Sequence, residues 1–188
     1  MTLLLNRCPR LFTVDELYRL IDAGILAPDE RVELVEGEIV PMSPHDPKHS
    51  DALAWCNNIF SEHFGSTHLV RIQLSLRLSQ RSELEPDLSL LPKDQLPPRG
   101  THPTIVPFVL EVSNTSLSYD RGEKLKLYAR AGIPEYWIVN VRDRVVEVHR
   151  DPQGDDYGDR FQRGPGDVIE LLHMPCYLFP VNTLLGDP

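Results

Sequence analysis

Hydrophobic and polar residues alternate without interruption from Val70 to Leu78, so that every second side chain in this segment is apolar. A period of two places those side chains on one face of an extended chain and predicts a half-buried β-strand. A second apolar run, residues 105–112, predicts a strand that is covered on both faces at the centre of a sheet. Asp87 opens a shorter apolar segment, residues 87–91, which predicts another strand.

Turn residues between apolar segments predict two hairpins. The first hairpin pairs residues 32–35 with 38–40 around a turn at Glu36-Gly37. The second pairs residues 135–141 with 144–149 around a turn at Arg142-Asp143. The proline-rich segment 92–103 is predicted to be a surface loop, and the polar segment 154–166 is predicted to be mobile. Residues 168–172 are predicted to form a last strand.

Three segments carry helix signals. Thr13-Val14-Asp15-Glu16 matches a capping box, in which Thr and Glu satisfy each other's free amides at a helix start. The helical segments are residues from Thr13 to about Gly24, 48–64 before Gly65, and 120–131 before Gly132 and Pro134. Mixed helices and strands predict an α/β (α+β) layer fold, with a central mixed β-sheet flanked by helices.

The 188 residues suit a single domain, 1–188, with its core at about 12–150 and C-terminal strands and a tail at 151–188. No apolar run approaches the roughly 20 residues that a membrane helix needs, and the first residues do not resemble a signal peptide. Cys8, Cys56 and Cys176 are far apart and odd in number, which favours small buried thiols in a reducing cytoplasm.

The net charge of −9 argues against broad binding to phosphate backbones, because proteins that grip nucleic acids are usually basic. Any nucleic-acid surface on this chain must therefore be local. The basic candidates are Arg71, Arg77 and Arg81 on one segment, and Arg121, Lys124, Lys126 and Arg130 on another.

Two acidic residues interrupt the apolar segments. Asp87 begins one predicted strand and Glu111 lies near the end of the central one, where it shares a face with Val109 and Ser113. A buried carboxylate needs a cation or a metal beside it, because its desolvation is costly. Oxygen ligands favour Mg²⁺ or Mn²⁺, which polarises a phosphoryl group and lowers the pKa of a bound water. The pair therefore points to phosphodiester hydrolysis.

Lys124 follows on the first turns of the next predicted helix. Asp120 and Tyr128 lie four residues on either side of it and share its face, whereas Lys126 lies about 200° away around the helix. Only one of the two lysines can face the acids, and the inward position of Tyr128 favours Lys124.

Taken in order, these residues form a series with a recognisable pattern. It runs through Glu33-Leu34-Val35-Glu36-Gly37-Glu38, Met42-Ser43-Pro44, His49, Gln73, Pro86-Asp87-Leu88, Leu110-Glu111-Val112-Ser113, Asp120, Lys124, Tyr128 and Gly132-Ile133-Pro134-Glu135-Tyr136-Trp137-Ile138-Val139. The series resembles the PD-(D/E)xK nuclease superfamily, and most closely its Uma-type branch of endonuclease-like proteins. The resemblance covers about residues 12–150 and implies a restriction-endonuclease-like core.

The resemblance implies roles for individual residues. Glu33, Asp87 and Glu111 would hold one or two Mg²⁺ ions, with the backbone carbonyl of Val112 as a further ligand. Glu36 and Glu38 are rivals of Glu33 for its place. Ser113 occupies the position of the superfamily's lysine, which in this branch is moved to the following helix, here Lys124.

Lys124 would position or deprotonate the attacking water, or stabilise charge on the phosphoryl oxygens. The implied substrate is nucleic acid, DNA before RNA, and superfamily analogy suggests a homodimer.

Other interpretations remain open. Asp87, Glu111 and Lys124 could form a purely structural ion-pair network, which would fit a non-catalytic binding module of the same fold. A hydrolase of a smaller phosphorylated compound would suit the acidic surface better. His49 and Gln73 could face the site. Zinc at His45 and His49, and base stacking by Tyr136 or Trp137, are weaker alternatives.

Overall fold

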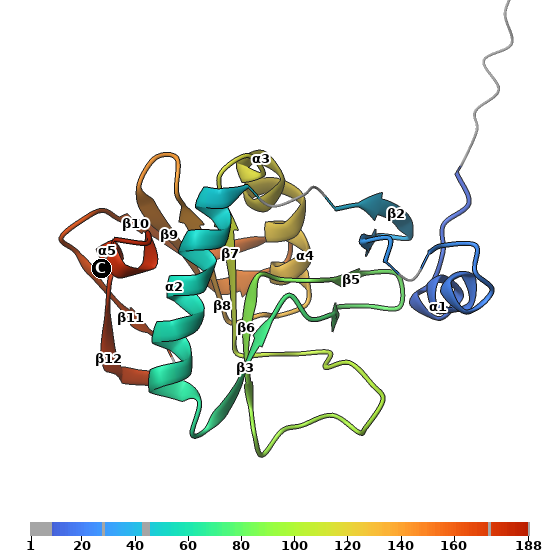
Figure 1. Ribbon diagram of the computed structural model, residues 1–188, viewed down its shortest axis with the longest axis horizontal. Helices are drawn as coiled ribbons and strands as arrows, with labels where there is room; N and C mark the ends of the chain where they lie inside the picture. Colours follow the sequence, from blue (N-terminus) through green and yellow to red (C-terminus); the bar gives the residue numbers. More distant parts are fainter. Residues whose placement is uncertain (1–8, 28, 43–45, 173, 188) are drawn as a thin grey trace, which may run out of the picture.

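A six-stranded mixed sheet forms the centre of the protein. The computed structural model describes residues 9–27, 29–42, 46–172 and 174–187. The strand order is β10-β9-β8-β7-β6-β3; β7 and β8 run parallel and every other neighbouring pair is antiparallel (Figure 1). The strands are β3 (His68–Ile72), β6 (Leu88–Pro92), β7 (Phe108–Ser113), β8 (Glu135–Asn140), β9 (Val145–Gln153) and β10 (Asp156–Arg163).

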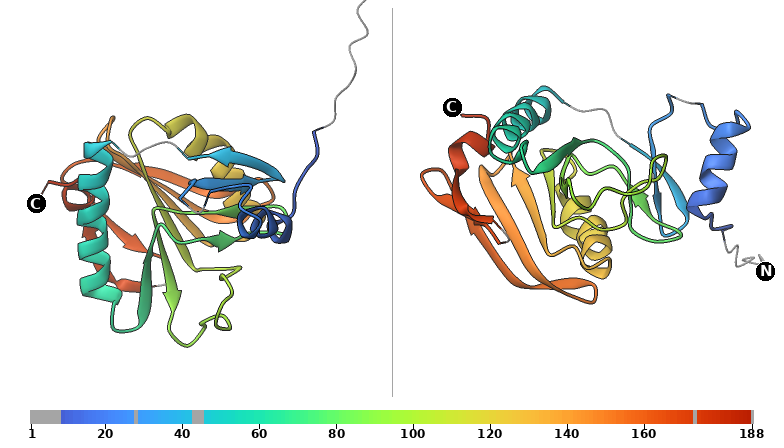
Figure 2. Two further views of the ribbon diagram at one scale, coloured as in Figure 1. Left: turned by 45° about the vertical axis from the view of Figure 1, so that its right-hand side comes forward. Right: turned by 90° about the horizontal axis from the view of Figure 1, so that it is seen from below.

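The two faces of this sheet bury separate apolar clusters. Leu110 and Val112 of β7 pack with α2 (Pro47–Phe64) and with the C-terminal elements, whereas Val109 packs on the opposite side with α4 (Leu125–Arg130). Figure 2 shows α2 and the C-terminal hairpin on one face and α4 on the other. The C-terminal elements are β11 (Val168–Leu171), β12 (Met174–Pro180) and α5 (Val181–Leu184). This arrangement confirms the predicted mixed sheet between helices.

A second, smaller sheet has the order β2-β1-β5-β4 and is covered by α1 (Val14–Asp22). Its strands are β1 (Val32–Val35), β2 (Glu38–Pro41), β4 (Leu76–Arg77) and β5 (Glu83–Leu84). The predicted hairpin around Glu36-Gly37 and the capping box at the start of α1 are both confirmed, with Thr13 and Glu16 bonded reciprocally.

The helix that was predicted at 120–131 is present but is not a regular α-helix. It begins earlier, with α3 (Leu117–Tyr119), passes through the π-helical segment η1 (Asp120–Lys124) and continues as α4. Asp120, Lys124 and Tyr128 are all buried, so the predicted inward face is confirmed; Lys126 is exposed. A π-helical turn changes which side chains face inward, and such turns are frequent at functional sites.

The prediction of one continuous strand from Val70 to Leu78 is wrong. The chain breaks at Gln73, which has φ 50°, and Leu74 is 52% exposed instead of lying in the core. The two halves enter different sheets as β3 and β4. The sequence alternation was real, but the turn places the two halves in separate packing environments.

The central strand is shorter than predicted, and the segment 154–166 differs from its predicted state. Ile105 is 57% exposed and β7 begins only at Phe108. Instead of a mobile segment, residues 156–163 form β10, which pairs with β9 along its whole length. An edge strand needs few apolar residues, because only one of its sides is paired and much of it faces water. The prediction also missed β12.

In the described part of the chain, no helix is both long and apolar enough to cross a membrane. Cys56 is a free, buried thiol, as predicted, and burial raises its pKa. Cys8 lies outside the described residues, and the side chain of Cys176 is outside them as well.

His149 on β9 makes stability depend on pH. Its ring stacks on Tyr136 at 5.6 Å between centroids, and among the described residues neither of its ring nitrogens has a hydrogen-bond partner. Burial lowers the pKa of His149 to about 4, from an ordinary value of 6.5. The unfolded chain therefore binds the proton first, and stability is complete above pH 6.5 and falls as pH decreases toward 4.

We predict that His149→Phe flattens this decline by about 2–3 kcal/mol in unfolding free energy between pH 7 and pH 4. Urea unfolding at a series of pH values measures it. His102→Phe, at an exposed position, is the matched control and should leave the decline in place. An unchanged slope in His149→Phe would show that other groups cause the loss.

Candidate active site

The four side chains that were predicted to act together lie around one cavity of about 320 Å³. They come from separate elements: Glu33 from β1, Asp87 from the residue before β6, Glu111 from β7 and Lys124 from η1. All four are at least nine-tenths buried. The sequence series thus corresponds to one site in space, although its members are up to 91 positions apart.

Asp87 is fixed by three donors. Its Oδ2 accepts the backbone N–H of Val112 at 2.8 Å and lies 2.9 Å from His49 Nε2, while its Oδ1 accepts from Gln73 Nε2 at 3.2 Å. Burial alone would raise the pKa of Asp87, but His49, the Val112 N–H and the charge of Lys124 together outweigh burial, and the pKa is lowered. Asp87 is therefore held as a carboxylate with a fixed orientation.

Glu111 lies at the centre of the site. Its Oε1 accepts from Lys124 Nζ at 2.8 Å and from the Tyr128 hydroxyl at 2.6 Å, and its Oε2 accepts from the backbone N–H of Asp87 at 3.3 Å. Burial raises the pKa of Glu111 well above its ordinary value, and the neighbouring acids add to this. The burial of Tyr128, together with the charge of Glu111, raises the pKa of Tyr128, so that the phenol remains a donor.

Glu33, which the sequence analysis preferred over Glu36, lines the cavity. Its Oε1 accepts the backbone N–H of Glu85 at 3.0 Å and lies 3.5 Å from Lys124 Nζ. Its Oε2 is 3.5 Å from the Tyr119 hydroxyl, and the ring of Tyr119 lies beneath the ammonium of Lys124. Lys124 therefore connects Glu33 to Glu111, and Glu111 is joined to Asp87 through the backbone N–H of Asp87.

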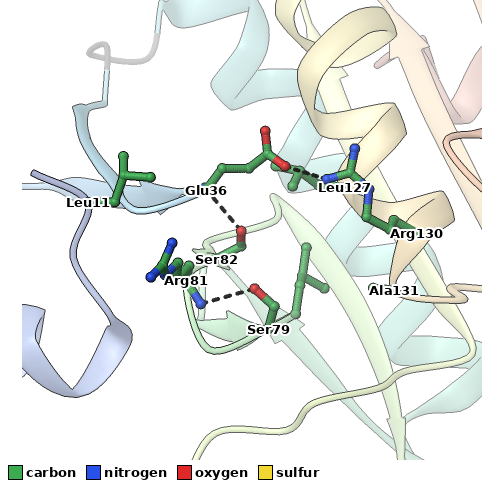
Figure 3. Close-up of a pocket in the computed structure, with 9 residues that line it drawn as sticks. Leu11, Glu36, Ser79, Arg81, Ser82, Leu127, Arg130 and Ala131 are labelled. Carbon is green, nitrogen blue, oxygen red and sulfur yellow. Dashed lines mark hydrogen bonds and ion pairs between the residues drawn. The ribbon is translucent and has the colours of Figure 1, made fainter. Parts of the chain in front are cut away.

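The rival Glu36 lies elsewhere. Its residue has φ 49° in the hairpin turn, its backbone N–H donates to Ser82 Oγ at 3.1 Å, and its carboxylate pairs with Arg130. Figure 3 shows this pair in a separate hollow, of about 460 Å³. The side chain of Glu36 is half exposed there, and it does not line the cavity of Asp87 and Glu111. Glu38, the other rival, is exposed on β2.

The site holds more acids than cations. Asp120 is also buried in it, with Oδ2 accepting from Ser116 Oγ at 2.6 Å, so four carboxylates surround Lys124 and His49. Burial raises the pKa of Asp120. For Lys124 burial acts in the opposite direction, but Glu111, Glu33 and Asp120 outweigh it and raise the pKa of the ammonium. The excess of negative charge would be relieved by an added cation.

The donor set suits Mg²⁺ or Mn²⁺ in its chemistry, because all its candidate ligands are oxygens and its charge is negative. The ligands are not arranged in advance: within the described ranges, no group of three His, Cys, Asp or Glu side chains is placed to hold a metal ion. The oxygens of Asp87 and Glu111 are instead engaged by protein donors. A cation would have to replace some of these contacts.

Several residues of the site were missed by sequence reasoning. Asp46 caps α2 through the backbone N–H groups of Lys48 and His49, and its second oxygen accepts from Asn114 Nδ2 at 3.0 Å. This contact joins the helix start to the segment after β7. Asp46-Pro47 is a recognisable helix start, since proline is favoured in the first turn, and it would have placed His49 one turn into the helix.

Some other predicted residues lie away from the site. Tyr136 and Trp137 are both fully buried, so neither is placed to stack on a base. Arg121 pairs with Glu147 through two hydrogen bonds, of 2.8 and 2.7 Å. His45, the suggested zinc partner of His49, lies outside the described residues.

Comparisons with known proteins agree with the fold. A family model described as "Putative restriction endonuclease" matches residues 14–177. A crystal structure of a putative nuclease belonging to DUF820, from Anabaena variabilis ATCC 29413, is similar with a TM-score of 0.74 at 17% identity. The match covers 93% of this chain and 97% of that one. A search of curated proteins gives no match.

We predict that Lys124→Met destabilises the protein by about 3–5 kcal/mol, because it leaves Glu33 and Glu111 buried without their cation. Urea unfolding measures the change. Adding Glu111→Gln to this variant should recover part of the loss, which a double-mutant cycle quantifies. The control, Lys126→Met, is exposed on the same helix and should change stability little. Equal effects of the two lysine changes would contradict the geometry.

Proposed function

The chain belongs to the Uma2 family, whose model is described as "Putative restriction endonuclease", and we propose that it is a metal-dependent endonuclease that hydrolyses nucleic-acid phosphodiester bonds. One observation carries the proposal: three carboxylates from three strand regions and one lysine converge on a single cavity. A purely structural network of this kind is less favoured, because it would bury more acids than it neutralises.

Glu33, Asp87 and Glu111, with the carbonyl of Val112, are the residues that would hold Mg²⁺ or Mn²⁺. The ion supplies charge for the phosphoryl oxygens and a bound water of lowered pKa. His49, Gln73 and the Val112 N–H fix the orientation of Asp87, and Tyr128 fixes that of Glu111. Lys124 supplies positive charge at the reacting phosphate, since it lies 2.8 Å from Glu111 among acids that favour its ammonium form.

Several of the basic side chains that could contact a nucleic-acid substrate are already paired with acids of the same chain. Arg121 and Arg130 are engaged by Glu147, Glu36 and Asp155, and Arg77 is engaged by Asp15. A net charge of −9 adds a repulsive field toward long polyanions. These ion pairs favour a second candidate, a hydrolase of short oligonucleotides or small phosphodiesters, which needs only the site itself.

The test is cleavage of mixed DNA and RNA substrates by purified protein with Mn²⁺ and with EDTA. We expect Mn²⁺-dependent cutting that falls at least about a hundredfold in Asp87→Ala and Lys124→Ala, the range typical of lost charge stabilisation. Lys126→Ala, two residues after Lys124 at the start of α4, and Glu36→Gln, in the turn of the hairpin that carries Glu33, are controls, and both variants should cut normally. A parallel assay with a small phosphodiester addresses the second candidate.

A separate measurement tests the metal. Mn²⁺ should raise the melting temperature of the wild type, because a ligand that binds only the folded state stabilises it, and Asp87→Ala should abolish the rise. Cutting that persists in both site variants would point to a contaminant or another site. If the protein neither cuts nor is stabilised by Mn²⁺, the non-catalytic interpretation remains.

A further inference from the structure

A further buried acid, Glu83 on β5, lines a cavity separate from that of Asp87 and Glu111. We propose that Glu83, Tyr18 and His102 form a pocket for a guanine base, which would serve as a recognition subsite for the nucleic-acid substrate proposed above. The inference rests on that function for its biological role, but the pocket itself is argued from its own geometry.

Glu83 is a buried carboxylate with one unused oxygen. It is 6% exposed; its Oε1 accepts from the Tyr18 hydroxyl at 2.5 Å, and its buried Oε2 has no hydrogen-bond partner among the described residues. A buried unsatisfied acceptor is costly, so a ligand that donates to it gains affinity. Glu83 thus has a clear requirement for an outside donor.

The nearest strand partner does not satisfy this requirement. Arg77 of β4 lies opposite Glu83 of β5 in the sheet register. Its guanidinium instead pairs with Asp15 at 3.1 Å, at the edge of the pocket. The negative charge of Glu83 therefore remains available to a ligand.

Glu83 lines a cavity of about 760 Å³ whose lining also includes most of residues 95–105. This is ample for one nucleotide, since ligand pockets are typically about 300–1,000 Å³. Tyr18 and His102 line the same cavity, with their rings nearly parallel at 17° and 6.0 Å between centroids. His102 Nε2 lies 3.0 Å from the Tyr18 hydroxyl, which fixes this aromatic wall beside the carboxylate.

An aromatic wall beside an acceptor-only group favours a planar ligand with donors on its edge. Unstacked bases bind to proteins in this manner, by stacking on Tyr or His and by hydrogen bonds on the Watson–Crick edge. Guanine presents a ring N–H next to an amino group, which matches the two oxygens of a carboxylate, and a carboxylate oxygen that already accepts once can accept again. Adenine places an acceptor at the ring position and would be repelled.

The position of the pocket suits a substrate that also reaches the nuclease site. Glu85, two residues after Glu83, lines the cavity of Asp87 and Glu111, and its backbone N–H donates to Glu33. The short segment 83–85 therefore contributes to both cavities. A single-stranded or unpaired stretch could place one base against Glu83 while its backbone continues toward Lys124.

The test measures binding of 5′-GMP and 5′-AMP to the full chain by calorimetry, in EDTA so that cleavage does not occur. Both nucleotides carry the same ribose and phosphate, so a preference reports the base alone. We expect GMP to bind at least about tenfold more tightly, a modest share of the discrimination that a hydrogen-bonding site can supply. Glu83→Gln replaces the free acceptor with a donor and should remove the preference.

Three further variants complete the test. His102→Ala changes an exposed position and should weaken the binding of both nucleotides on the order of tenfold, because stacking on the ring is lost. Glu62→Gln, an exposed glutamate on α2, should change neither. Asp87→Asn, which disables the proposed nuclease, should keep the preference for GMP. Absence of GMP binding at millimolar concentration, or a preference that survives Glu83→Gln, would overturn the pocket without touching the nuclease proposal.

Discussion

The structure depends on how the negative charge of several carboxylates, buried around one lysine, is compensated. Removing an ion from water costs several kcal/mol even after the surroundings relax, and this cost must be offset by donors and counter-charge. The carboxylate of Glu111 is stabilised by hydrogen bonds from Lys124, Tyr128 and the Asp87 N–H. The carboxylate of Asp87 is stabilised by His49, Gln73 and the Val112 N–H. The donors come from separate parts of the chain, and with Glu33 on β1 the site joins the two sheets, α2 and the π-helical segment.

The irregular features of the backbone occur where the site needs them. Gln73 adopts φ 50° and thereby presents its backbone N–H and its side chain to Asp87. The π-helical turn at Asp120–Lys124 places Asp120 and Lys124 in the buried environment of the same cavity. Left-handed residues and π-turns are locally unfavourable, and they persist where the surrounding contacts determine them. In this protein those contacts are the buried acids.

The sequence predicted the parts of the fold that local patterns control. Capping at Thr13, the hairpin at Glu36-Gly37 and the helix ending before Gly65 all follow from nearby residues, and each is present. The errors have a different origin. The alternation from Val70 to Leu78 did not indicate that the chain changes sheets at Gln73, because that turn depends on a bond to Asp87, which is distant in sequence. The polar edge strand β10 is held by its pairing with β9, which no local pattern of its own reveals.

The candidate site likewise contains residues that the sequence could indicate and contacts that it could not. The acids and Lys124 could be selected because charged residues in apolar segments are conspicuous, and the resemblance gave them an order. The supporting contacts of His49, Gln73 and Asp46 could not be derived, since they depend on how α2 approaches the end of β7. Tyr119 was likewise not selected, although it lies within 5.8 Å of the Lys124 ammonium, because a tyrosine on a helix is usually explained by core packing.

The acidic charge of the whole chain fits a protein that works through its cavities instead of through a broad basic surface. Its arginines are largely committed to acids of their own chain, as in Arg121–Glu147 and Arg77–Asp15, so they stabilise the fold and leave little for phosphate contacts. Affinity for a polyanion would then come from the cation that the excess of carboxylates attracts, and selectivity from a base-sized pocket such as that of Glu83. Glu83 lines one cavity and Glu85, two residues later, lines the other, so the short segment 83–85 links the proposed base pocket to the acids that would act on the backbone of the same substrate.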